Sequence, residues 1–487
     1  METHFFSHHA PRATRHAFWL LLLTIGCQPA MKYEKPAAPE PPRKPAALET
    51  PEPKNPAPIA WLDARPATVQ PPVSLQFVCE TDGAEWAALT KFWNPPPTPE
   101  QQAAAALLSP LTAASLAQMG VKIKVPAGLD NPRDFLPADN PPTLGKWQLG
   151  QRLFYDKTWL GDGRESCASC HNPQTAFADN AQTHFGVNAP TLVNCVFNRR
   201  QFWDGRVETL EEVVQRTVED ETAPAQEAPA FRHVWSGVVG RLRANDEYRQ
   251  PFLNVFGQAA TQDAVGKALA TYMRTLLAAD SVHDRAMSLQ TAENAAELTA
   301  VHYEKALREA DLKKLGLDEK SKTDGAKRIY RGYRLFNDLE GHKTGCILCH
   351  KGREFTDGKF HNIGVGFSPF EPGQEPGRFA SLPVGHKDRL LIGAYKTPTL
   401  RGLPRTGPYF HNGSATMLES AVLFHVDGGR WNEYLDPAFR DAKNNDLPRT
   451  WDVPEAELAD LVLFLRTLDG EDVEKAVGPA RDESSER

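Results

Sequence analysis

Apolar residues recur at helical spacing along most of the chain after residue 149. Five stretches carry apolar side chains at positions i, i+3 and i+4, as does a helix that buries one face. Few stretches alternate between apolar and polar residues as half-buried strands do. The pattern therefore predicts a mainly helical protein, with helices over residues 210–218, 262–278, 292–315, 326–339 and 454–468, and an Ala/Leu-rich helix over 102–117.

The N-terminus has the composition of an export signal. Arg12 and Arg15 precede a short apolar run over residues 17–25. This run is typical of a signal peptide, because a membrane-spanning helix needs about 20 apolar residues. Cys27 resembles the lipidated cysteine of bacterial lipoproteins, although Thr24 stands where leucine is usual. We expect a periplasmic protein anchored to the outer membrane through lipid on Cys27; a plain secreted protein is the alternative.

Composition excludes several classes of protein. The 487 residues are 41% hydrophobic and 24% charged, which is ordinary for a globular protein. A net charge of −7 leaves no basic footprint for nucleic acid. Seven cysteines in so long a chain are too few for a disulfide scaffold, so their spacing matters more than their number. Cys195 is expected to be a packed thiol, and a disulfide with Cys79 stays open.

Two pentapeptides of the form Cys-x-x-Cys-His stand out, at residues 167–171 and 346–350. This motif is the attachment signal for c-type haem. Two thiols one helical turn apart add across the two vinyl groups of the porphyrin, and the following imidazole then binds the iron. A zinc site or a redox-active cysteine pair would be the alternatives. The motifs predict two covalent haem c groups, held by Cys167, Cys170, Cys346 and Cys349, with His171 and His350 as iron ligands.

Further motifs surround these two sites in a fixed order, at residues 149–156, 188–194, 198–206, 360–365, 395–401 and 406–413. Together they resemble the bacterial di-haem cytochrome c peroxidase family, including its MauG-like branch. The resemblance covers roughly residues 139–470. It implies two cytochrome c-like helical domains packed together, the first haem meeting peroxide and the second transferring electrons.

Composition and the extent of the resemblance together suggest how the chain is divided. The expected segments are a signal peptide (1–27), a Pro-rich linker (28–72), an extra segment without an assigned role (73–138), an N-terminal haem domain (139–324), a C-terminal haem domain (325–472) and a charged tail (473–487).

Family motifs imply two features between the haems. Trp203 matches the tryptophan that bridges the pair; a core aromatic is the alternative reading. Asn188, Thr406 and Pro408 match the positions that hold a Ca²⁺ ion through one side-chain and two backbone oxygens, the ligands that suit this hard cation. Turn-forming residues at these positions need no metal. His361 and His411 are expected to organise haem propionates and loops.

At the second haem the chain departs from the family pattern. His425 falls where the MauG-like branch has a tyrosine ligand and the classical peroxidases have a methionine. An imidazole there gives a bis-histidine haem, whose reduction potential should be lower than that of a His/Met haem. A surface histidine beside a Gly-Gly turn is the alternative.

The distal side of the first haem departs further. Ala223 occupies the position of the family's catalytic glutamate, so Glu219 or Glu221 would have to supply the carboxylate that aids peroxide cleavage. A solvated acidic loop is the other reading of these two residues. His184 follows the first haem motif and could ligate the first iron, act as a base in an open pocket, or face solvent.

We therefore expect a di-haem peroxidase that reduces hydrogen peroxide with electrons from a donor protein such as a small cytochrome or cupredoxin. A MauG-like oxidase of a protein side chain or organic substrate is one alternative. A non-catalytic di-haem electron carrier or redox sensor is another, because the catalytic glutamate is missing. The lipid anchor is the only expected contact with a membrane.

Overall fold

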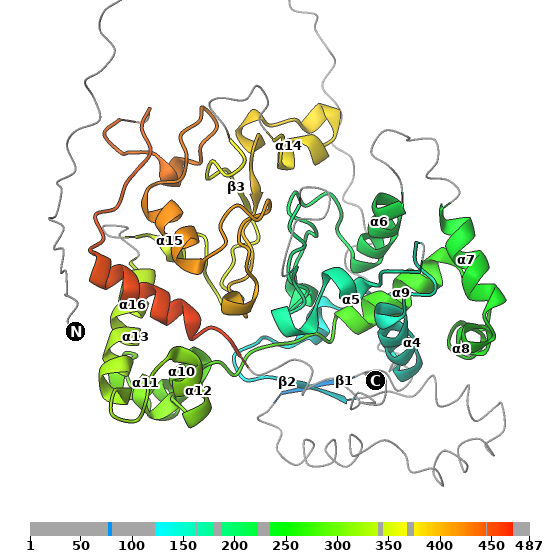
Figure 1. The fold of residues 1–487 in the computed structure, drawn as a ribbon, viewed down its shortest axis with the longest axis horizontal. Coiled ribbons are helices and arrows are strands. Elements are labelled where there is room, and N and C mark those ends of the chain that lie inside the picture. Colours follow the sequence, from blue (N-terminus) through cyan, green and yellow to red (C-terminus); the bar gives the residue numbers. More distant parts are fainter. Residues whose placement is uncertain are drawn as a thin grey trace, which may run out of the picture. The chain divides into compact units, whose positions relative to one another are not determined.

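The computed structural model describes residues 76–79, 122–161, 163–179, 187–222, 234–338, 344–367, 375–444 and 446–470. All of them belong to one unit that spans Gln70–Arg487. Within this part of the chain thirteen α-helices accompany two small sheets, which confirms the mainly helical fold (Figure 1). Among the same residues, no helix combines the length and the apolar character needed to cross a bilayer.

The α-helices are α4 (Leu144–Tyr155), α5 (Cys167–Cys170), α6 (Leu210–Thr222), α7 (Val234–Ala244), α8 (Asp246–Phe256), α9 (Gln262–Met273), α10 (Val282–Ala292), α11 (Ala300–Ala306), α12 (Glu309–Leu315), α13 (Lys322–Phe336), α14 (Arg378–Ser381), α15 (Leu418–Val426) and α16 (Glu455–Arg466). The parallel strands β1 (Gln76–Cys79) and β2 (Lys122–Val125) form one sheet, and the antiparallel strands β3 (Phe360–His361) and β4 (Tyr395–Lys396) form the other.

One predicted helix is wrong in its extent. The pattern over 292–315 reads as a single helix, but the structure forms α11 and α12 there. Leu307 and Arg308 have extended backbones between them, and the Asp311 carboxylate accepts a bond of 2.8 Å from the Arg308 amide, which starts the second helix. Apolar spacing continues across the break, so periodicity alone does not detect it. The helix expected over 102–117 lies outside the described residues.

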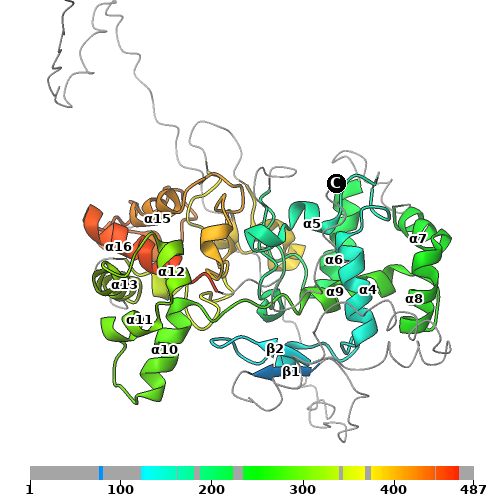
Figure 2. The ribbon, with the colours of Figure 1, turned by 60° about the horizontal axis from the view of Figure 1, so that its bottom comes forward.

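The first hydrophobic core is built where α4 crosses α9 (Figure 2). Thr143 caps α4 by accepting a bond from the Lys146 amide. The helices touch at Gly150, where a Cβ atom would lie 2.0 Å from the carbonyl oxygen of Ala268 and 3.0 Å from Cβ of Tyr272. Glycine costs about 1 kcal/mol in a helix, and here it permits a close crossing.

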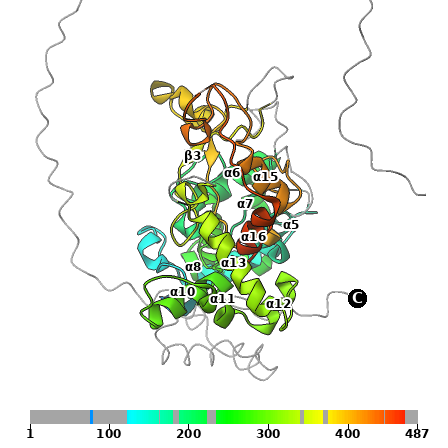
Figure 3. The same cartoon turned by 90° about the vertical axis from the view of Figure 1, so that its left-hand side faces the viewer.

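The second core repeats this construction where α13 crosses α16 (Figure 3). A Cβ atom at Gly332 would lie 2.0 Å from the carbonyl oxygen of Asp460 and 2.8 Å from Cβ of Phe464. In both crossings the two contacted residues are four apart on the second helix. The chain therefore contains two helical domains of the same construction, as the cytochrome c-like fold class predicts.

Along the chain, the residues of the first core end at Ala279 and those of the second core begin at Val282, so the junction between the domains lies here. This junction lies well before the boundary expected after residue 324, because α10, α11 and α12 pack on the second core rather than the first. The extents of the haem domains stay a prediction.

A buried ion pair lies at the junction between the two domains. The Arg401 guanidinium, whose side chain is 1% exposed, donates to both carboxylate oxygens of Asp284 at 2.8 and 3.1 Å. It also donates to the carbonyl oxygens of Gly128 (3.0 Å) and Arg353 (2.8 Å). Gly128 follows β2 in the segment to which the sequence assigns no role. That segment therefore contributes a wall of the junction between the two domains.

Candidate functional site

The first Cys-x-x-Cys-His motif forms a tight helical turn. Its helix α5 holds Cys167 and Cys170 one turn apart, and the His171 amide continues the turn by bonding to the Cys167 carbonyl at 2.9 Å. Nδ1 of His171 lies 3.0 Å from the carbonyl oxygen of Phe177. A carbonyl can only accept, so Nδ1 carries the proton and Nε2 is left for a metal. Burial lowers the pKa of His171 and favours the neutral, metal-binding imidazole.

The second motif repeats this arrangement. The His350 amide bonds to the Cys346 carbonyl at 2.9 Å, and Nδ1 of His350 donates to the carbonyl oxygen of Phe355 at 2.9 Å. Phe177 and Phe355 both adopt positive φ angles, 55° and 51°, which are uncommon for a bulky residue. Burial, helped by the neighbouring His425, lowers the pKa of His350 to about 4. Both proximal imidazoles are thus neutral and oriented by a backbone carbonyl.

His425 faces His350 across the second site. It lies on α15 and donates from Nδ1 to the Ala421 carbonyl at 2.8 Å, which leaves Nε2 as an acceptor. The two ring centroids are 6.5 Å apart. Two imidazoles that bind one metal ion from opposite sides, each through a nitrogen ~2 Å from it, have centroids roughly 6 Å apart. The pair therefore fits an iron between them, as a bis-histidine haem requires.

The second site lies in a large apolar cavity. About 1420 Å³ of space without protein atoms, part of it open to solvent, adjoins Cys346, Cys349 and both histidines. Such a cavity suits a macrocycle rather than a bare ion. Its apolar wall includes Phe336, Leu348, Ile363, Val365, Leu400, Leu403, Leu418, Val422, Phe439, Trp451, Leu461 and Leu465.

Trp203 reaches this cavity from the N-terminal domain. Its side chain contributes to the cavity wall, and its indole Nε1 donates to the Asn188 carbonyl at 2.7 Å. Its own carbonyl accepts from the Lys396 amide at 2.8 Å, and its ring lies edge-on to that of His411 at 6.4 Å. Trp203 thus has contacts in both domains, which is the placement that a bridging role needs. The role itself stays a prediction.

The predicted calcium ligands also lie at the junction. The Asn188 side chain lies 2.5 Å from the Pro408 carbonyl oxygen and 3.1 Å from that of Phe410, and its own Oδ1 atom is buried without a hydrogen-bond partner. Converging oxygens beside an unpaired buried amide oxygen suit a hard cation. The Thr406 hydroxyl, by contrast, donates to the Leu403 carbonyl at 3.1 Å, which leaves only its backbone oxygen as a ligand.

Of the candidates for the distal side of the first haem, the structure describes the side chain of Glu219. Glu219 lies on α6, 3.1 Å from the Arg216 guanidinium one turn before it. Glu221 belongs to the same helix, but its side chain lies outside the described residues. Outside them as well are His184, Ala223 and Cys27.

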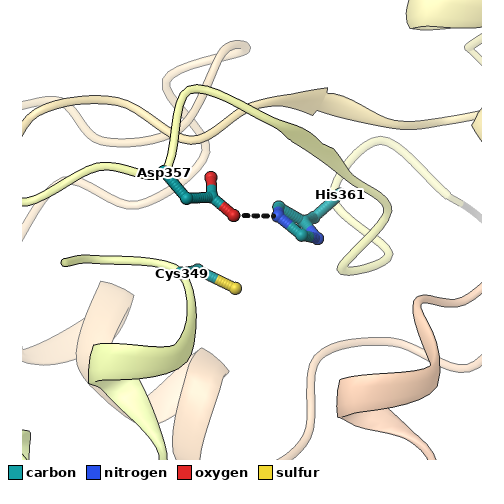
Figure 4. A group of neighbouring side chains, drawn as sticks. All are labelled: Cys349, Asp357 and His361. Atoms are coloured by element: carbon teal, nitrogen blue, oxygen red, sulfur yellow. Dashed lines mark hydrogen bonds and ion pairs between the residues drawn. The ribbon is translucent and has the colours of Figure 1, made fainter.

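Beside the second motif is a charged group that the sequence did not reveal. Figure 4 shows the carboxylate of Asp357 beside the imidazole of His361, near the sulfur of Cys349. His361 bonds to Asp357 at 3.0 Å and to Asp436 at 2.7 Å. Burial opposes the charged imidazole, but the hydrogen bonds to the Asp436 and Asp357 carboxylates raise the pKa of His361 above its ordinary value. Because Cys349 is a predicted haem attachment point, we read the group as a cation beside the macrocycle, not as a metal site.

Two more polar side chains, one half-buried and one buried, lie near the junction. Nζ of Lys396 donates to the Arg200 carbonyl at 2.9 Å, and burial lowers the pKa of Lys396 to about 8. Cys195 is a buried free thiol that donates to the Met273 carbonyl at 3.5 Å, and burial raises its pKa to about 12. The packed thiol agrees with expectation, and no disulfide involves Cys195.

Comparison with known proteins identifies the family. A family model described as di-haem cytochrome c peroxidase matches residues 145–292. The methylamine utilization protein MauG of Methylophilus methylotrophus is 30% identical over 343 residues, which cover 69% of this chain and 85% of that protein. Cytochrome c551 peroxidase of Nitrosomonas europaea is 30% identical over 293 residues, 58% of this chain and 74% of that protein.

A solved structure is similar as well. The crystal structure of a MauG-like protein associated with microbial copper homeostasis aligns with a TM-score of 0.52 at 26% identity, covering 72% of this chain and 95% of that one. The two histidine sites, the helical domains and these relatives agree on two haem c groups as the cofactors. The chain belongs to the family of di-haem cytochrome c peroxidases and MauG proteins.

Proposed function

We propose that this protein is a di-haem c-type peroxidase, which reduces hydrogen peroxide with electrons from an external donor protein. The observation that carries the proposal is that His171 and His350 are both neutral and oriented by a backbone carbonyl, while Trp203 bonds to Asn188 in one domain and to Lys396 in the other. The relatives include a cytochrome c551 peroxidase at 30% identity, which supports the same reaction class.

The haem ligands of this proposal come from the two motifs and α15. When bound, haem supplies an iron that binds peroxide and exchanges electrons. The residues that would hold it are Cys167, Cys170 and His171 at the first site, and Cys346, Cys349, His350 and His425 at the second.

The two sites differ in their histidines, and we propose that they have different functions. His350 and His425 would together hold the second haem, whose part would then be to exchange electrons rather than to bind substrate. The first haem, which His171 would hold, is therefore the one that we propose meets the peroxide. His184 follows the first motif in the sequence, and we propose it as a second histidine ligand of the first haem or as a base beside that haem.

The chain's own contribution is orientation and proton handling. The carbonyls of Phe177 and Phe355 hold the protons at Nδ1 of the two proximal histidines. The Asn188 carbonyl fixes the indole of Trp203, and a Ca²⁺ ion held by Asn188, Thr406 and Pro408 would stiffen the same junction. Peroxide cleavage also needs a proton donor, for which we propose Glu221 or, less directly, Glu219, which is already paired with Arg216.

A MauG-like oxidase is the second candidate. It is favoured by the 30% identity to a MauG protein, of which the chain covers 85%, and by Ala223 at the position of the usual catalytic glutamate. Such an enzyme would store oxidising equivalents and pass them to a protein side chain or an organic substrate.

Peroxide consumption by the purified holo-protein tests the proposal. We expect turnover with reduced cytochrome c well above that of free haem at equal concentration. The double variant Cys167→Ala/Cys170→Ala should abolish it while the second haem stays bound. Oxidising equivalents that persist in the protein without donor turnover would favour the MauG-like function. If the protein does not react with peroxide, a non-catalytic electron carrier is the function that remains.

We also propose that the protein is exported to the periplasm and anchored by lipid on Cys27. Growth with labelled palmitate should mark the wild type and not Cys27→Ala. An unlabelled wild type would remove the anchor from this account.

A further inference from the structure

A tyrosine, a histidine and a carboxylate meet in the wall of the second-haem cavity. The Tyr395 hydroxyl donates to Oε2 of Glu375 at 2.7 Å. Nε2 of His411 bonds to the same oxygen atom. The rings of Tyr395 and His411 are stacked, with centroids 3.5 Å apart and planes 15° from parallel.

This group continues to Trp203. The buried ring of His411 lies edge-on to the indole at 6.4 Å, and Trp203, Tyr395 and His411 all line the cavity. At the opposite end, the side chain of Glu375 is 42% exposed. A line of aromatic contacts thus runs from the tryptophan at the domain junction to a carboxylate in contact with solvent.

The backbone holds the phenol and the carboxylate together. Tyr395 lies on β4, opposite His361 of β3. The chain from Glu375 to Tyr395 forms a loop that is closed at its base, where the Arg378 amide donates to the Ala394 carbonyl at 2.8 Å. The bond between phenol and carboxylate is therefore built into the fold.

We propose that Tyr395 is a proton-coupled one-electron relay between the haem pair and the external donor or substrate, with Glu375 as the proton acceptor. The oxidant is the oxidising equivalent that hydrogen peroxide delivers, so the inference rests on the proposed function. Tyr395 gives up one electron, and its O–H bond breaks as the proton passes to the Glu375 carboxylate. An external one-electron reductant then restores the electron, and the proton returns to the phenol oxygen. Two such cycles account for the two electrons that one peroxide takes.

The local electrostatics suit this role. Burial and the Glu375 carboxylate raise the pKa of Tyr395, so the phenol does not ionise before it is oxidised. The hydrogen bond from His411 holds the pKa of Glu375 below its ordinary value, so the acceptor is ready as a carboxylate. An electron can then leave Tyr395 without building a positive charge, because the proton needs to move only across one hydrogen bond.

Two other tyrosines each meet only one of the two requirements for the relay, which are a place in the cavity wall and a carboxylate as proton acceptor. Tyr409 lines the same cavity, but its hydroxyl donates to the backbone carbonyl of Leu403 at 3.2 Å. Tyr248 donates to a carboxylate, that of Asp156, at 2.5 Å, but it belongs to the first core, away from the cavity. Tyr395 alone of these three has both the cavity and the acceptor.

Freeze-quenched electron paramagnetic resonance after one equivalent of peroxide tests the relay. The holo-protein is produced with ring-deuterated tyrosine, which narrows the signal of a tyrosyl radical and not that of a tryptophanyl radical. We expect a deuterium-sensitive signal that Tyr395→Phe removes and that Tyr409→Phe and Tyr248→Phe retain. Glu375→Gln keeps an acceptor atom but takes up no proton, so it should lower the radical yield by about 10-fold or more.

The outcomes separate the relay from the peroxidase function. Peroxide consumption with no tyrosyl signal, or with a signal that survives Tyr395→Phe, overturns the relay and leaves the peroxidase function intact. If the protein consumes no peroxide, a flash-generated ruthenium(III) tris-bipyridine complex takes the place of peroxide as the oxidant. A radical that Tyr395→Phe abolishes would then support the relay without the peroxidase, and any other result would overturn it.

Discussion

Glu354 is a buried carboxyl group that gives the domain junction a distinctive pH dependence. Its side chain is 15% exposed, and both of its oxygens are buried. The nearest cation is Arg401, whose Nε lies 3.7 Å away and whose guanidinium already pairs with Asp284. Burial, only partly opposed by Arg401, raises the pKa of Glu354 from 4.5 to about 7.

The size of the effect follows from this shift. A pKa raised on folding means that the folded protein holds the proton more tightly, so stability falls as pH rises from 4.5 to about 7. The difference between 4.5 and 7, at about 1.4 kcal/mol for each pH unit, is about 3 kcal/mol. The penalty is absent below pH 4.5 and complete above pH 7. Glu354→Gln should therefore be up to about 3 kcal/mol more stable than the wild type at pH 8, and close to it at pH 5.

Urea unfolding of the holo-proteins at pH 5 and pH 8 measures this difference. Glu419→Gln is the control, because Glu419 pairs with Arg466 at the surface and both side chains are 44% exposed. Removing that exposed pair should change stability by less than about 1 kcal/mol at either pH. The reasoning is refuted if Glu354→Gln is less stable than the wild type at pH 8, or if its free energy of unfolding differs from that of the wild type by the same amount at both pH values.

Two further predictions concern the junction. Arg401→Ala leaves the Asp284 carboxylate buried without its charged partner, with only the hydrogen bonds from Ser281, and should cost about 3–5 kcal/mol in urea unfolding. Arg401→Lys should recover part of this, and an Ala variant of wild-type stability would contradict the buried pair. A Ca²⁺ ion at Asn188 should make thermal unfolding sensitive to a chelator. Asn188→Ala should lower the Tm and abolish that sensitivity, whereas a chelator effect that persists in the variant would place the ion elsewhere.

Local signals in the sequence predict the helical class, the family and the positions of the haem motifs. A Cys-x-x-Cys-His motif carries its meaning within five residues, and amphipathic spacing reveals a helix without its partner. Gly150 and Gly332 show the limit of such signals. Each stands inside a helix, where glycine is unfavourable, and only the crossing with Ala268 or Asp460 explains it.

Contacts between residues that are not neighbours along the chain could not be predicted from the sequence. No residue type signals that Phe177 and Phe355 adopt positive φ angles, because that conformation is imposed by the surrounding loop. Tyr395 lies 20 residues after Glu375 and His411 lies 36 residues after it, and the three meet through the return of a loop. Gly128 likewise receives its role only from Arg401 in the other domain.

The central claim is that His350 and His425 hold the second haem iron from opposite sides, and electron paramagnetic resonance of the resting ferric protein tests it directly. We expect a low-spin signal from this haem that becomes high-spin in His425→Ala and returns when free imidazole is added. A low-spin signal that His425→Ala leaves unchanged would contradict the claim.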